Sequence, residues 1–205
     1  MKADGGEAVG FVGPAIRGHW GQATNQVAAI TLSVIIAFWT KNVRGGNTIA
    51  MRNIRPVSPS DLELICRHRH EMFREAGRTE ADLAPMAEPF RRWLAKRLED
   101  GAYFGFVAEN AGRAIGAVGL MAIDWPPHPA HPLDDRRGYV LNLFVEPAYR
   151  GRGVAHALMT ASDREFARRG LQYLILHATE AGRPLYERSG WVRTTEMAKT
   201  LTKAD

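Results

Sequence analysis

The chain has 205 residues, of which 45% are hydrophobic and 24% charged, an ordinary balance for a globular protein with one sizeable core. Its single cysteine, Cys66, excludes an internal disulfide framework and a cysteine metal cluster, and we expect a buried structural thiol. The net charge of +5 is spread along the chain, which excludes a basic arm for nucleic acid and suits an anionic small ligand.

Residues 1–50 differ from the rest because glycines interrupt them repeatedly and charged residues are few. Their one apolar run, 27–39, falls well short of the ~20 residues that cross a bilayer. A signal peptide is also disfavoured, because the run begins late, has little positive charge before it and lacks a clear cleavage site. We expect residues 1–50 to be a poorly ordered extension, or the product of a start codon set too far upstream. Residues 51–205 should then form the functional domain.

The domain should begin with a strand and a helix. Residues 51–57 predict a short strand. The segment from Ser58 to Asp61 combines a capping serine, a proline at the first helical position and an acidic residue. A helix should therefore run from there to Ala76 and stop at Gly77.

A second helical region should follow directly. Thr79 and Asp82 repeat the capping signal at its start. Pro85 and Pro89 should break this helix, which then resumes through Leu98.

Two apolar segments, 102–108 and 113–124, predict strands that are joined by a tight hairpin turn. The next segment, 125–132, contains four prolines and must be a loop. Its His128 and His131 could bind a metal ion, but two histidines without a third ligand are weak evidence, and we expect no metal site.

The stretch 139–169 is the most informative part of the chain. Residues 139–145 are apolar and rich in β-branched and aromatic side chains, which predicts a buried strand that ends at Pro147. A loop rich in arginine and glycine, 150–155, follows and leads into a long amphipathic helix. Glycines let the backbone approach a ligand, and the unpaired N–H groups of the first helical turn point at it. This order therefore predicts a site for a pyrophosphate.

Two nucleotide-binding motifs do not fit this loop. A Walker loop requires a lysine followed by serine or threonine, and a dinucleotide fingerprint requires a third glycine where His156 stands. The pattern that fits is Arg-x-x-Gly-x-Ala, formed by Arg150, Gly153 and Ala155 directly after a Val-Glu-Pro strand end. It resembles the acyl-CoA pyrophosphate loop of the GNAT superfamily of N-acetyltransferases. Standing alone, such a short motif is weak evidence, because an ordinary strand-to-helix turn can also be rich in arginine and glycine.

The remaining sequence predicts a strand at 171–178, a short helix at 181–188 and a final strand at 191–201. Gly170 and Gly190 should end the two preceding helices. The complete expected order is β-α-α-β-β-β-α-β-α-β.

A second motif lies near the C-terminus. Residues 185–191 resemble the Leu-Tyr-x-x-x-Gly-Phe segment that closes GNAT domains, with Trp191 in place of the phenylalanine. Tyr186 lies 31 residues after Ala155, about where the family has it. One departure is Thr179, which stands seven residues before the tyrosine where the family often has asparagine. The two motifs at this separation extend the resemblance from residue 52 to the C-terminus.

The resemblance implies an α/β (α+β) domain with the GNAT fold, in which a central mixed, mostly antiparallel sheet is flanked by helices on both faces. It also implies acetyl-CoA as the acyl donor. The residues expected to bind this donor are Leu143, Phe144, Val145, Arg150, Gly151, Arg152, Gly153, Val154, Ala155, Thr179 and Tyr186.

Acyl transfer from a thioester to an amine sets three chemical requirements: the amine loses a proton, the carbonyl is polarised, and the leaving thiolate receives a proton or a hydrogen bond. In the family the tyrosine of the second motif is the acid, which implies this role for Tyr186. The alternative for Tyr186 is simple helix packing. We expect a backbone N–H around Phe144 or Val145 to polarise the carbonyl.

The general base stays open among three candidates. Glu146 ends the central strand, His177 ends the neighbouring strand at the same sheet edge, and Asn142 could act through a water chain. The basic patch 67–70 is either a solvated helix face or a contribution to the acceptor pocket.

These observations predict a cytoplasmic N-acetyltransferase that moves an acetyl group from acetyl-CoA to a primary amine, that of a small molecule, by direct attack in a ternary complex. One alternative acceptor is a protein N-terminus or lysine. A different alternative is a catalytically silent acyl-CoA-binding or sensing module, which has no need of the phenol of Tyr186. We expect no membrane or nucleic-acid partner, and since dimers are common in the family, a homodimer is an expected state.

Overall fold

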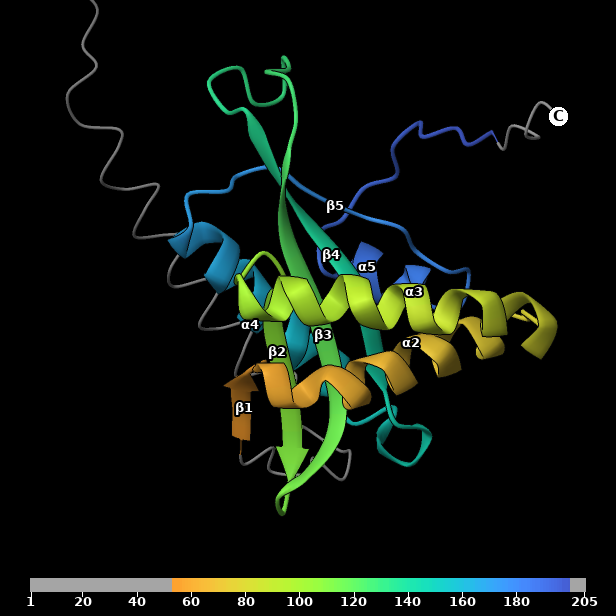
Figure 1. Ribbon diagram of the computed structural model, residues 1–205. Coiled ribbons are helices and arrows are strands. Elements are labelled where there is room, and N and C mark those ends of the chain that lie inside the picture. The colour runs from red at the N-terminus through yellow and green to blue at the C-terminus, as the bar shows by residue number, and fades with distance from the viewer. Residues whose placement is uncertain (1–52, 200–205) are drawn as a thin grey trace, which may run out of the picture. The chain divides into compact units, whose positions relative to one another are not determined.

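The computed structural model describes residues 53–199 (Figure 1). The expectation for residues 1–50 therefore lies outside the described residues. The elements, in chain order, are β1 (Asn53–Pro56), the 3-10 helix η1 (Pro59–Asp61), α2 (Leu62–Glu75), α3 (Glu80–Glu99), β2 (Phe104–Asn110), β3 (Arg113–Asp124), β4 (Arg136–Val145), the 3-10 helix η2 (Pro147–Tyr149), α4 (Val154–Arg168), β5 (Leu174–Leu176) and α5 (Arg183–Arg188).

The strands form one five-stranded sheet in the order β1-β2-β3-β4-β5. The pairs β1–β2, β2–β3 and β3–β4 are antiparallel, whereas β4 and β5 are parallel. The predicted hairpin is present between β2 and β3, and Ala111 and Gly112 at its tip both have positive φ. The sheet is thus mixed and mostly antiparallel, as the sequence predicts.

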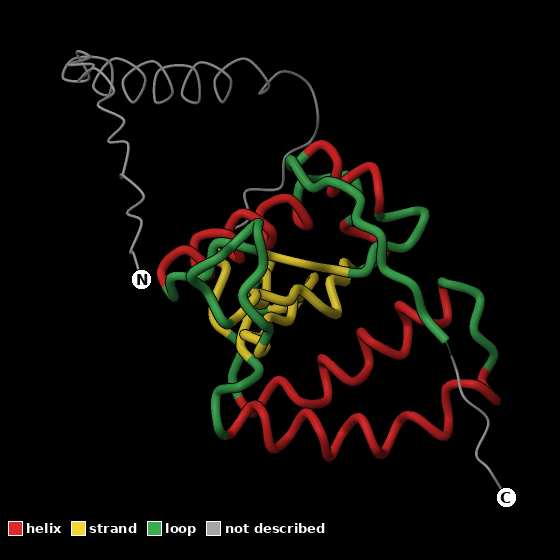
Figure 2. Tube along the Cα trace, turned by 90° about the horizontal axis from the view of Figure 1, so that it is seen from above, coloured by secondary structure: helices red, strands yellow, loops and turns green. Residues whose placement is uncertain are grey.

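Helices cover both faces of this sheet (Figures 1 and 2). On one face α4 packs across β2, β3 and β4 and buries Leu158 and Phe166 completely. On the other face α2 and α3 pack against each other and the sheet, with Ile65 and Leu94 in a second core around Tyr103. Helices α2, α3 and α4 each bury one apolar side, and for α4 this is what its amphipathic sequence pattern predicts.

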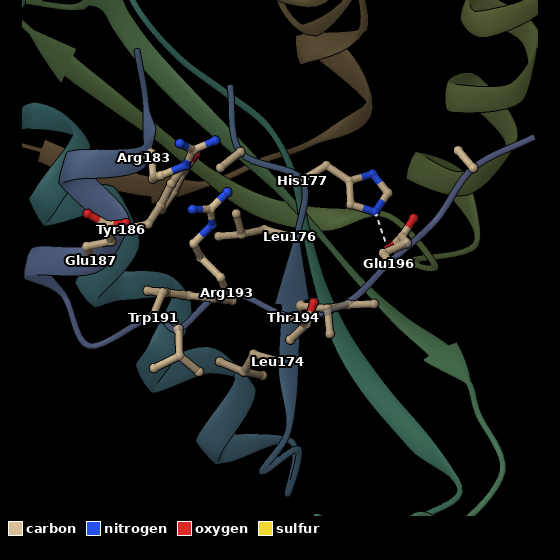
Figure 3. A pocket seen from close by; sticks show the side chains of 14 residues that line it. Leu174, Leu176, His177, Arg183, Tyr186, Glu187, Trp191, Arg193, Thr194 and Glu196 are labelled. Carbon is tan, nitrogen blue, oxygen red and sulfur yellow. Dashed lines mark hydrogen bonds and ion pairs between the residues drawn. The ribbon is translucent and has the colours of Figure 1, made fainter. Parts of the chain in front are cut away.

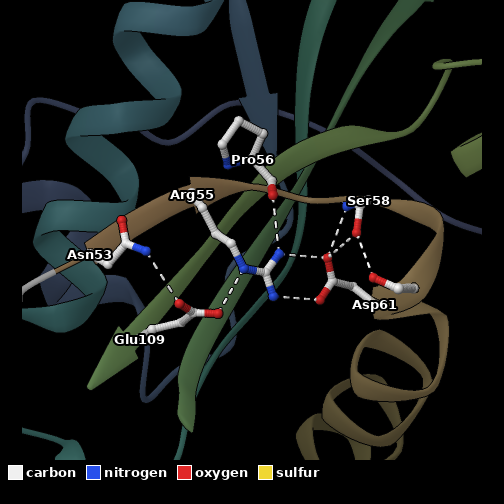
Figure 4. Close-up of polar contacts among 7 residues, drawn as sticks. Asn53, Arg55, Pro56, Ser58, Asp61 and Glu109 are labelled. Carbon is white, nitrogen blue, oxygen red and sulfur yellow. Dashed lines mark hydrogen bonds and ion pairs between the residues drawn. The ribbon is translucent and has the colours of Figure 1, made fainter. Parts of the chain in front are cut away.

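One arginine links β1, at the start of the domain, to η1 and to β2 (Figure 4). Arg55 on β1 donates two hydrogen bonds of 2.8 Å to the carboxylate of Asp61, which is 5% exposed. Its Nε donates to Glu109 of β2 at 2.7 Å. Asp61 also accepts from the N–H and hydroxyl of Ser58, which completes the predicted capping box. This guanidinium is therefore compensated by two carboxylates.

Helix α3 differs from its prediction because Pro85 and Pro89 do not break it. Both prolines are exposed and lie four residues apart, on the solvent side of the helix, whereas Leu83 and Leu94 face inward. A proline leaves the carbonyl four residues earlier without its N–H partner. On an exposed face water can replace that bond, so packing against α2 can keep the helix continuous. The predicted cap of Thr79 and Asp82 is confirmed.

The predicted final strand, 191–201, is wrong for the residues that the structure describes. Residues 191–199 form no strand, and Val192 and Met197 are 82% and 95% exposed. The strand predicted at 171–178 is also shorter and covers only 174–176. A strand needs a partner for its ladder, and the three residues of β5 offer too short an edge for a neighbour to pair with.

Candidate active site

The central feature of the site is the opening between β4 and β5. The two strands pair only from Gly138 to Val140, yet β4 continues to Val145. Glu146 N–H donates to Ile115 of β3, and alternation along a strand then turns the N–H groups of Val145 and Leu143 toward the open side. These N–H groups therefore point to the side of β4 on which β5 no longer pairs.

A bulge in β4 lies where the strands separate. The register against β3 shifts between Ala117 and Gly119, and the bulged residue Asn142 has a φ of 53°, which is uncommon for a residue other than glycine. Asn142 accepts a hydrogen bond of 2.6 Å from Arg69 of α2 and donates one of 3.2 Å to the buried hydroxyl of Tyr103. A Cβ on Gly119 would lie 1.9 Å from that hydroxyl, so only glycine leaves room for it. Arg69 and Tyr103 thus hold the bulge in place from the sheet face that α2 and α3 cover.

The loop after β4 presents backbone donors. Gly151 and Gly153 have φ values of 71° and 81°, which orient the chain into α4 without steric cost. The first hydrogen bond of α4 runs from Ala157 to Gly153, so the N–H groups of Val154, Ala155 and His156 have no partner within the helix. The first turn of α4 carries no acidic residue. This arrangement can bind an anion.

The two arginines of the loop differ in their surroundings. Arg150 donates to both oxygens of Glu75 at 2.7 and 2.8 Å and to the carbonyl of Val145 at 2.9 Å. It therefore fastens the loop to α2 and to the end of β4. Arg152 is exposed, and its guanidinium lies 5.8 Å from the ring of Tyr149.

Tyr186 of α5 borders a cavity of about 420 Å³ between β5, α5 and residues 191–198 (Figure 3). Its ring makes an edge contact with Trp191, with the centroids 6.3 Å apart, and its hydroxyl has no hydrogen-bond partner within residues 53–199. Burial raises the pKa of Tyr186 above its usual value of 10.0, so the phenol stays protonated at neutral pH. The hydroxyl of Thr179 accepts from the N–H of Gly182 and so caps the turn into α5.

His177 follows β5 and belongs to a short polar chain. Its Nε2 is 2.9 Å from the carboxylate of Glu196, and its Nδ1 is 3.4 Å from the hydroxyl of Tyr139 (Figure 3 shows the pair with Glu196). Tyr139 lies on β4 inside the segment that pairs with β5. The chain therefore lies at the point where the two strands begin to separate.

Glu146 faces α2 instead. Its carboxylate accepts from Arg67 at 3.0 Å and from Nε2 of His68 at 3.2 Å. Partial burial raises the pKa of Glu146, but these two hydrogen bonds outweigh it and lower the pKa below the usual 4.5. Burial lowers the pKa of His68, which is 1% exposed and packs on Phe144 with ring centroids 4.8 Å apart. His68 is therefore neutral at pH 7 in the folded protein.

The comparisons with known proteins agree with this geometry. The family model described as the acetyltransferase (GNAT) family matches residues 63–191. This chain belongs to the GNAT acetyltransferase family.

Solved structures of similar proteins support the assignment. A GCN5-related N-acetyltransferase from Ralstonia eutropha JMP134 is 56% identical, with a TM-score of 0.72 over 73% of this chain and 97% of that chain. A predicted acetyltransferase from Clostridium acetobutylicum, solved with acetyl-CoA, is 25% identical, with a TM-score of 0.65 over 73% of this chain and 95% of that one. Glucosamine-6-phosphate N-acetyltransferase from Arabidopsis thaliana is 15% identical and shares the fold, with a TM-score of 0.52 over 74% of this chain and 98% of that one. No curated protein matches the sequence of this chain.

The match to the family model confirms the predicted GNAT family. The mixed sheet with helices on both faces confirms the predicted fold class. The interpretation of residues 67–70 as a solvated helix face is wrong for two of them. His68 is buried, and Arg69 is half-buried against Asn142. The 3.6-residue period of α2 could have indicated this, because His68 lies three residues after the buried Ile65.

Sequence reasoning also missed Tyr139 and Glu196 as neighbours of His177. Tyr139 stands in an apolar strand two residues before Leu141, which packs on the α2 and α3 side. Alternation along the strand places the two side chains on the same face, and this was the available signal. Nothing in the sequence indicates that Glu196 lies beside a histidine 19 positions earlier.

The proline-rich loop before β4 has its own contacts. His131 accepts a hydrogen bond of 3.0 Å from Arg137, and its ring stacks on that of His128. Within residues 53–199 no group of three or more histidine, cysteine or acidic side chains is arranged to hold a metal ion. None of the helices in the described range is long and apolar enough to span a membrane.

Proposed function

We propose that this GNAT acetyltransferase transfers the acetyl group of acetyl-CoA to a primary amine of a small molecule by direct attack in a ternary complex. The observation that carries the proposal is the presence of two sets of free backbone donors at the end of β4 and directly after it. One set lies on β4, where β5 diverges from it, and the other lies in the loop 151–156 that follows β4. A related acetyltransferase from Clostridium acetobutylicum has been solved with acetyl-CoA, which supports the choice of donor.

The donor site would use the backbone more than the side chains. The N–H groups of 151–156, including those of Gly151, Gly153, Val154 and Ala155, would bind the pyrophosphate, with Arg152 adding positive charge. Arg150 would act indirectly, because its guanidinium already pairs with Glu75. Thr179 lies beside the start of α5, where it would border the bound donor.

The thioester carbonyl would lie at the free edge of β4. Leu143 and Val145 turn their N–H groups to that edge, whereas alternation directs the N–H of Phe144 toward β3. We therefore assign the polarising contact to Leu143 and Val145 and give Phe144 a packing role against His68. Fixed donors of this kind stabilise the charge that develops on the carbonyl oxygen.

Tyr186 would donate its proton to the leaving thiolate. The raised pKa keeps the phenol protonated over the neutral range, and its hydroxyl has no competing partner within the described residues. Its place on the cavity wall leaves the hydroxyl open to a bound molecule.

His177 is the favoured base. Glu196 can orient its ring and stabilise the imidazolium that proton abstraction creates, as carboxylates do beside catalytic histidines. Glu146 is less suited because two donors already hold it ionised, which makes it a weak base. Asn142 is held by Arg69 and Tyr103 and has little freedom to order a water.

The proposed setting is the cytoplasm, since a chain with one cysteine has no internal disulfide framework, and the proposed state is a homodimer. The test is thiol release from acetyl-CoA against a panel of small amines and of peptides with free N-termini or lysines. Turnover with small amines supports the proposal, and faster turnover with peptides would favour a protein acceptor. Tight acetyl-CoA binding without turnover on any amine or peptide would contradict an enzymatic role and favour a sensing module.

A further inference from the structure

Arg69 is a cation with an unusual environment. Its guanidinium carbon lies 4.8 and 4.5 Å from the ring centroids of Phe73 and Phe90. One Nη donates to Asn142, while its Nε is buried and has no hydrogen-bond partner in the described part of the chain. The side chain as a whole is only half-buried, so part of it remains accessible. Most of the five N–H donors of this arginine are thus unused.

No carboxylate compensates this charge among residues 53–199. The ionisable groups that act on Arg69 are Tyr103, Tyr139 and Cys66, which are all neutral near pH 7. Burial lowers the pKa of Arg69, which reflects the cost of holding a charge without a counter-ion.

The contrast with other arginines of the domain is clear. Arg55 binds two carboxylates, as Figure 4 shows, while Arg67 pairs with Glu146 and Arg150 with Glu75. An uncompensated guanidinium between two aromatic rings is costly for a purely structural role, because a neutral side chain could also hold Asn142.

The position of Arg69 relates it to the reaction. It contacts Asn142, two residues beyond Val140, the last residue of β4 that pairs with β5. Its charge also acts on Tyr139, whose hydroxyl is hydrogen-bonded to His177. Arg69 therefore lies on the sheet face that carries the proposed base, at the bulge where β4 and β5 separate. Its Nε is buried, so a ligand would be bound by the two Nη groups.

We propose that Arg69 binds a carboxylate of the acceptor, and that the acceptor is a free amino acid or a similar amine bearing one carboxylate. The single charge of the guanidinium matches a single carboxylate, and its planar fork binds that group through paired hydrogen bonds. This proposal rests on the proposed function and narrows its acceptor class. It disfavours an internal lysine of a protein, which carries no such group beside the amine.

The test compares matched amines with and without the carboxylate, using the full chain and acetyl-CoA. Suitable pairs are alanine and ethylamine, 4-aminobutyrate and propylamine, and lysine and cadaverine, which also vary the spacing between amine and carboxylate. The measured quantity is the ratio of kcat/KM within each pair. We expect the carboxylated member of at least one pair to be favoured by about 100-fold or more, since a site built to hydrogen-bond a group rejects analogues that lack it.

Variants separate binding by Arg69 from its contact with Asn142. Arg69→Met should reduce the preferred ratio to about one, and Arg69→Lys should retain part of it, because lysine keeps the charge but loses the fork. Tyr103→Phe is the matched control, since it removes the other hydrogen bond of Asn142 and leaves the cation in place. It should lower the rates for both members of a pair and keep their ratio.

Three results would overturn the proposal. They are turnover only of amines without a carboxylate, a preference that survives Arg69→Met, and a preference lost equally in Tyr103→Phe. Calorimetric titration with acetyl-CoA separates failure of the proposed function from failure of the role of Arg69. If acetyl-CoA does not bind, both proposals are overturned. Donor binding with turnover but no carboxylate preference would overturn the role of Arg69 alone.

Discussion

The role of Tyr186 gives the sharpest prediction, because Tyr186→Phe removes one oxygen and little else. The hydroxyl makes no hydrogen bond within residues 53–199, and the ring would keep its edge contact with Trp191. We therefore expect the free energy of unfolding to change by less than about 0.5 kcal/mol. Loss of a general acid lowers the rate by about 100-fold or more, which corresponds to about 2.7 kcal/mol in the activation free energy. The catalytic effect should thus exceed the structural one several times over.

The assay is thiol release at saturating acetyl-CoA and amine, with donor affinity measured separately by calorimetry. We expect kcat to fall about 100-fold while the Kd for acetyl-CoA stays within about threefold. An acid works only while protonated, so the wild-type rate should fall as pH rises through the raised pKa of Tyr186, above 10.0, and the variant should lack this decline. Tyr173→Phe is the matched control, since its hydroxyl also has no hydrogen bond within the described residues and it lies outside the site. A Tyr186→Phe variant with wild-type kcat would refute the acid role.

Three further outcomes are expected. Gly153→Glu places a carboxylate at the start of α4, and we expect it to weaken acetyl-CoA binding in calorimetry by at least about tenfold. The control is Gly170→Glu at the other end of the helix, where the glycine also has positive φ and open space, and this variant should bind acetyl-CoA normally. Equal effects of the two substitutions would contradict the assignment of the loop. A chain beginning at Met51 should fold and retain full activity, and insolubility or lost thiol release would show that residues 1–50 take part in the domain. Because the pKa of His68 lies below 6.5 in the folded state, the unfolded state binds a proton first, and the free energy of unfolding should decline as pH falls below 6.5. Denaturant unfolding between about pH 6.5 and 5 should show a shallower decline for His68→Gln than for the wild type. The same dependence on pH in both proteins would contradict this role of His68.

Local signals in the sequence predicted most of the fold. The capping residues Ser58 and Thr79 and the glycine loop before α4 each fix a short stretch of backbone, and short-range hydrogen bonds decide such stretches. The order of strands and helices up to α5 follows from these stretches and from the apolar periods between them. The same loop pattern also predicted the free N–H groups at the start of α4.

The failures concern interactions between distant parts of the chain. The continuity of α3 through Pro85 and Pro89 depends on its packing against α2, which local propensity does not contain. The missing strand at 191–199 depends on the length of β5, which is set by where β4 and β5 separate.

The polar part of the site was the least predictable. Arg69 and Asn142 are 73 positions apart, and Arg150 finds its partner 75 positions earlier. Sequence reasoning identified Arg150 as a phosphate ligand because it stands in the loop motif. Its ion pair with Glu75 is visible only once α2 lies beside the end of β4.

The central claim is that backbone donors at the start of α4 bind the pyrophosphate of acetyl-CoA while the free edge of β4 receives its thioester. The most direct test is a calorimetric titration of the full chain with acetyl-CoA and, in parallel, with acetyl-pantetheine, which has the same thioester arm but no pyrophosphate. Both should bind, and acetyl-CoA should bind at least about tenfold more tightly, a difference of about 1.4 kcal/mol. Equal affinities would contradict the role of the loop, and no binding of acetyl-CoA would contradict the account as a whole.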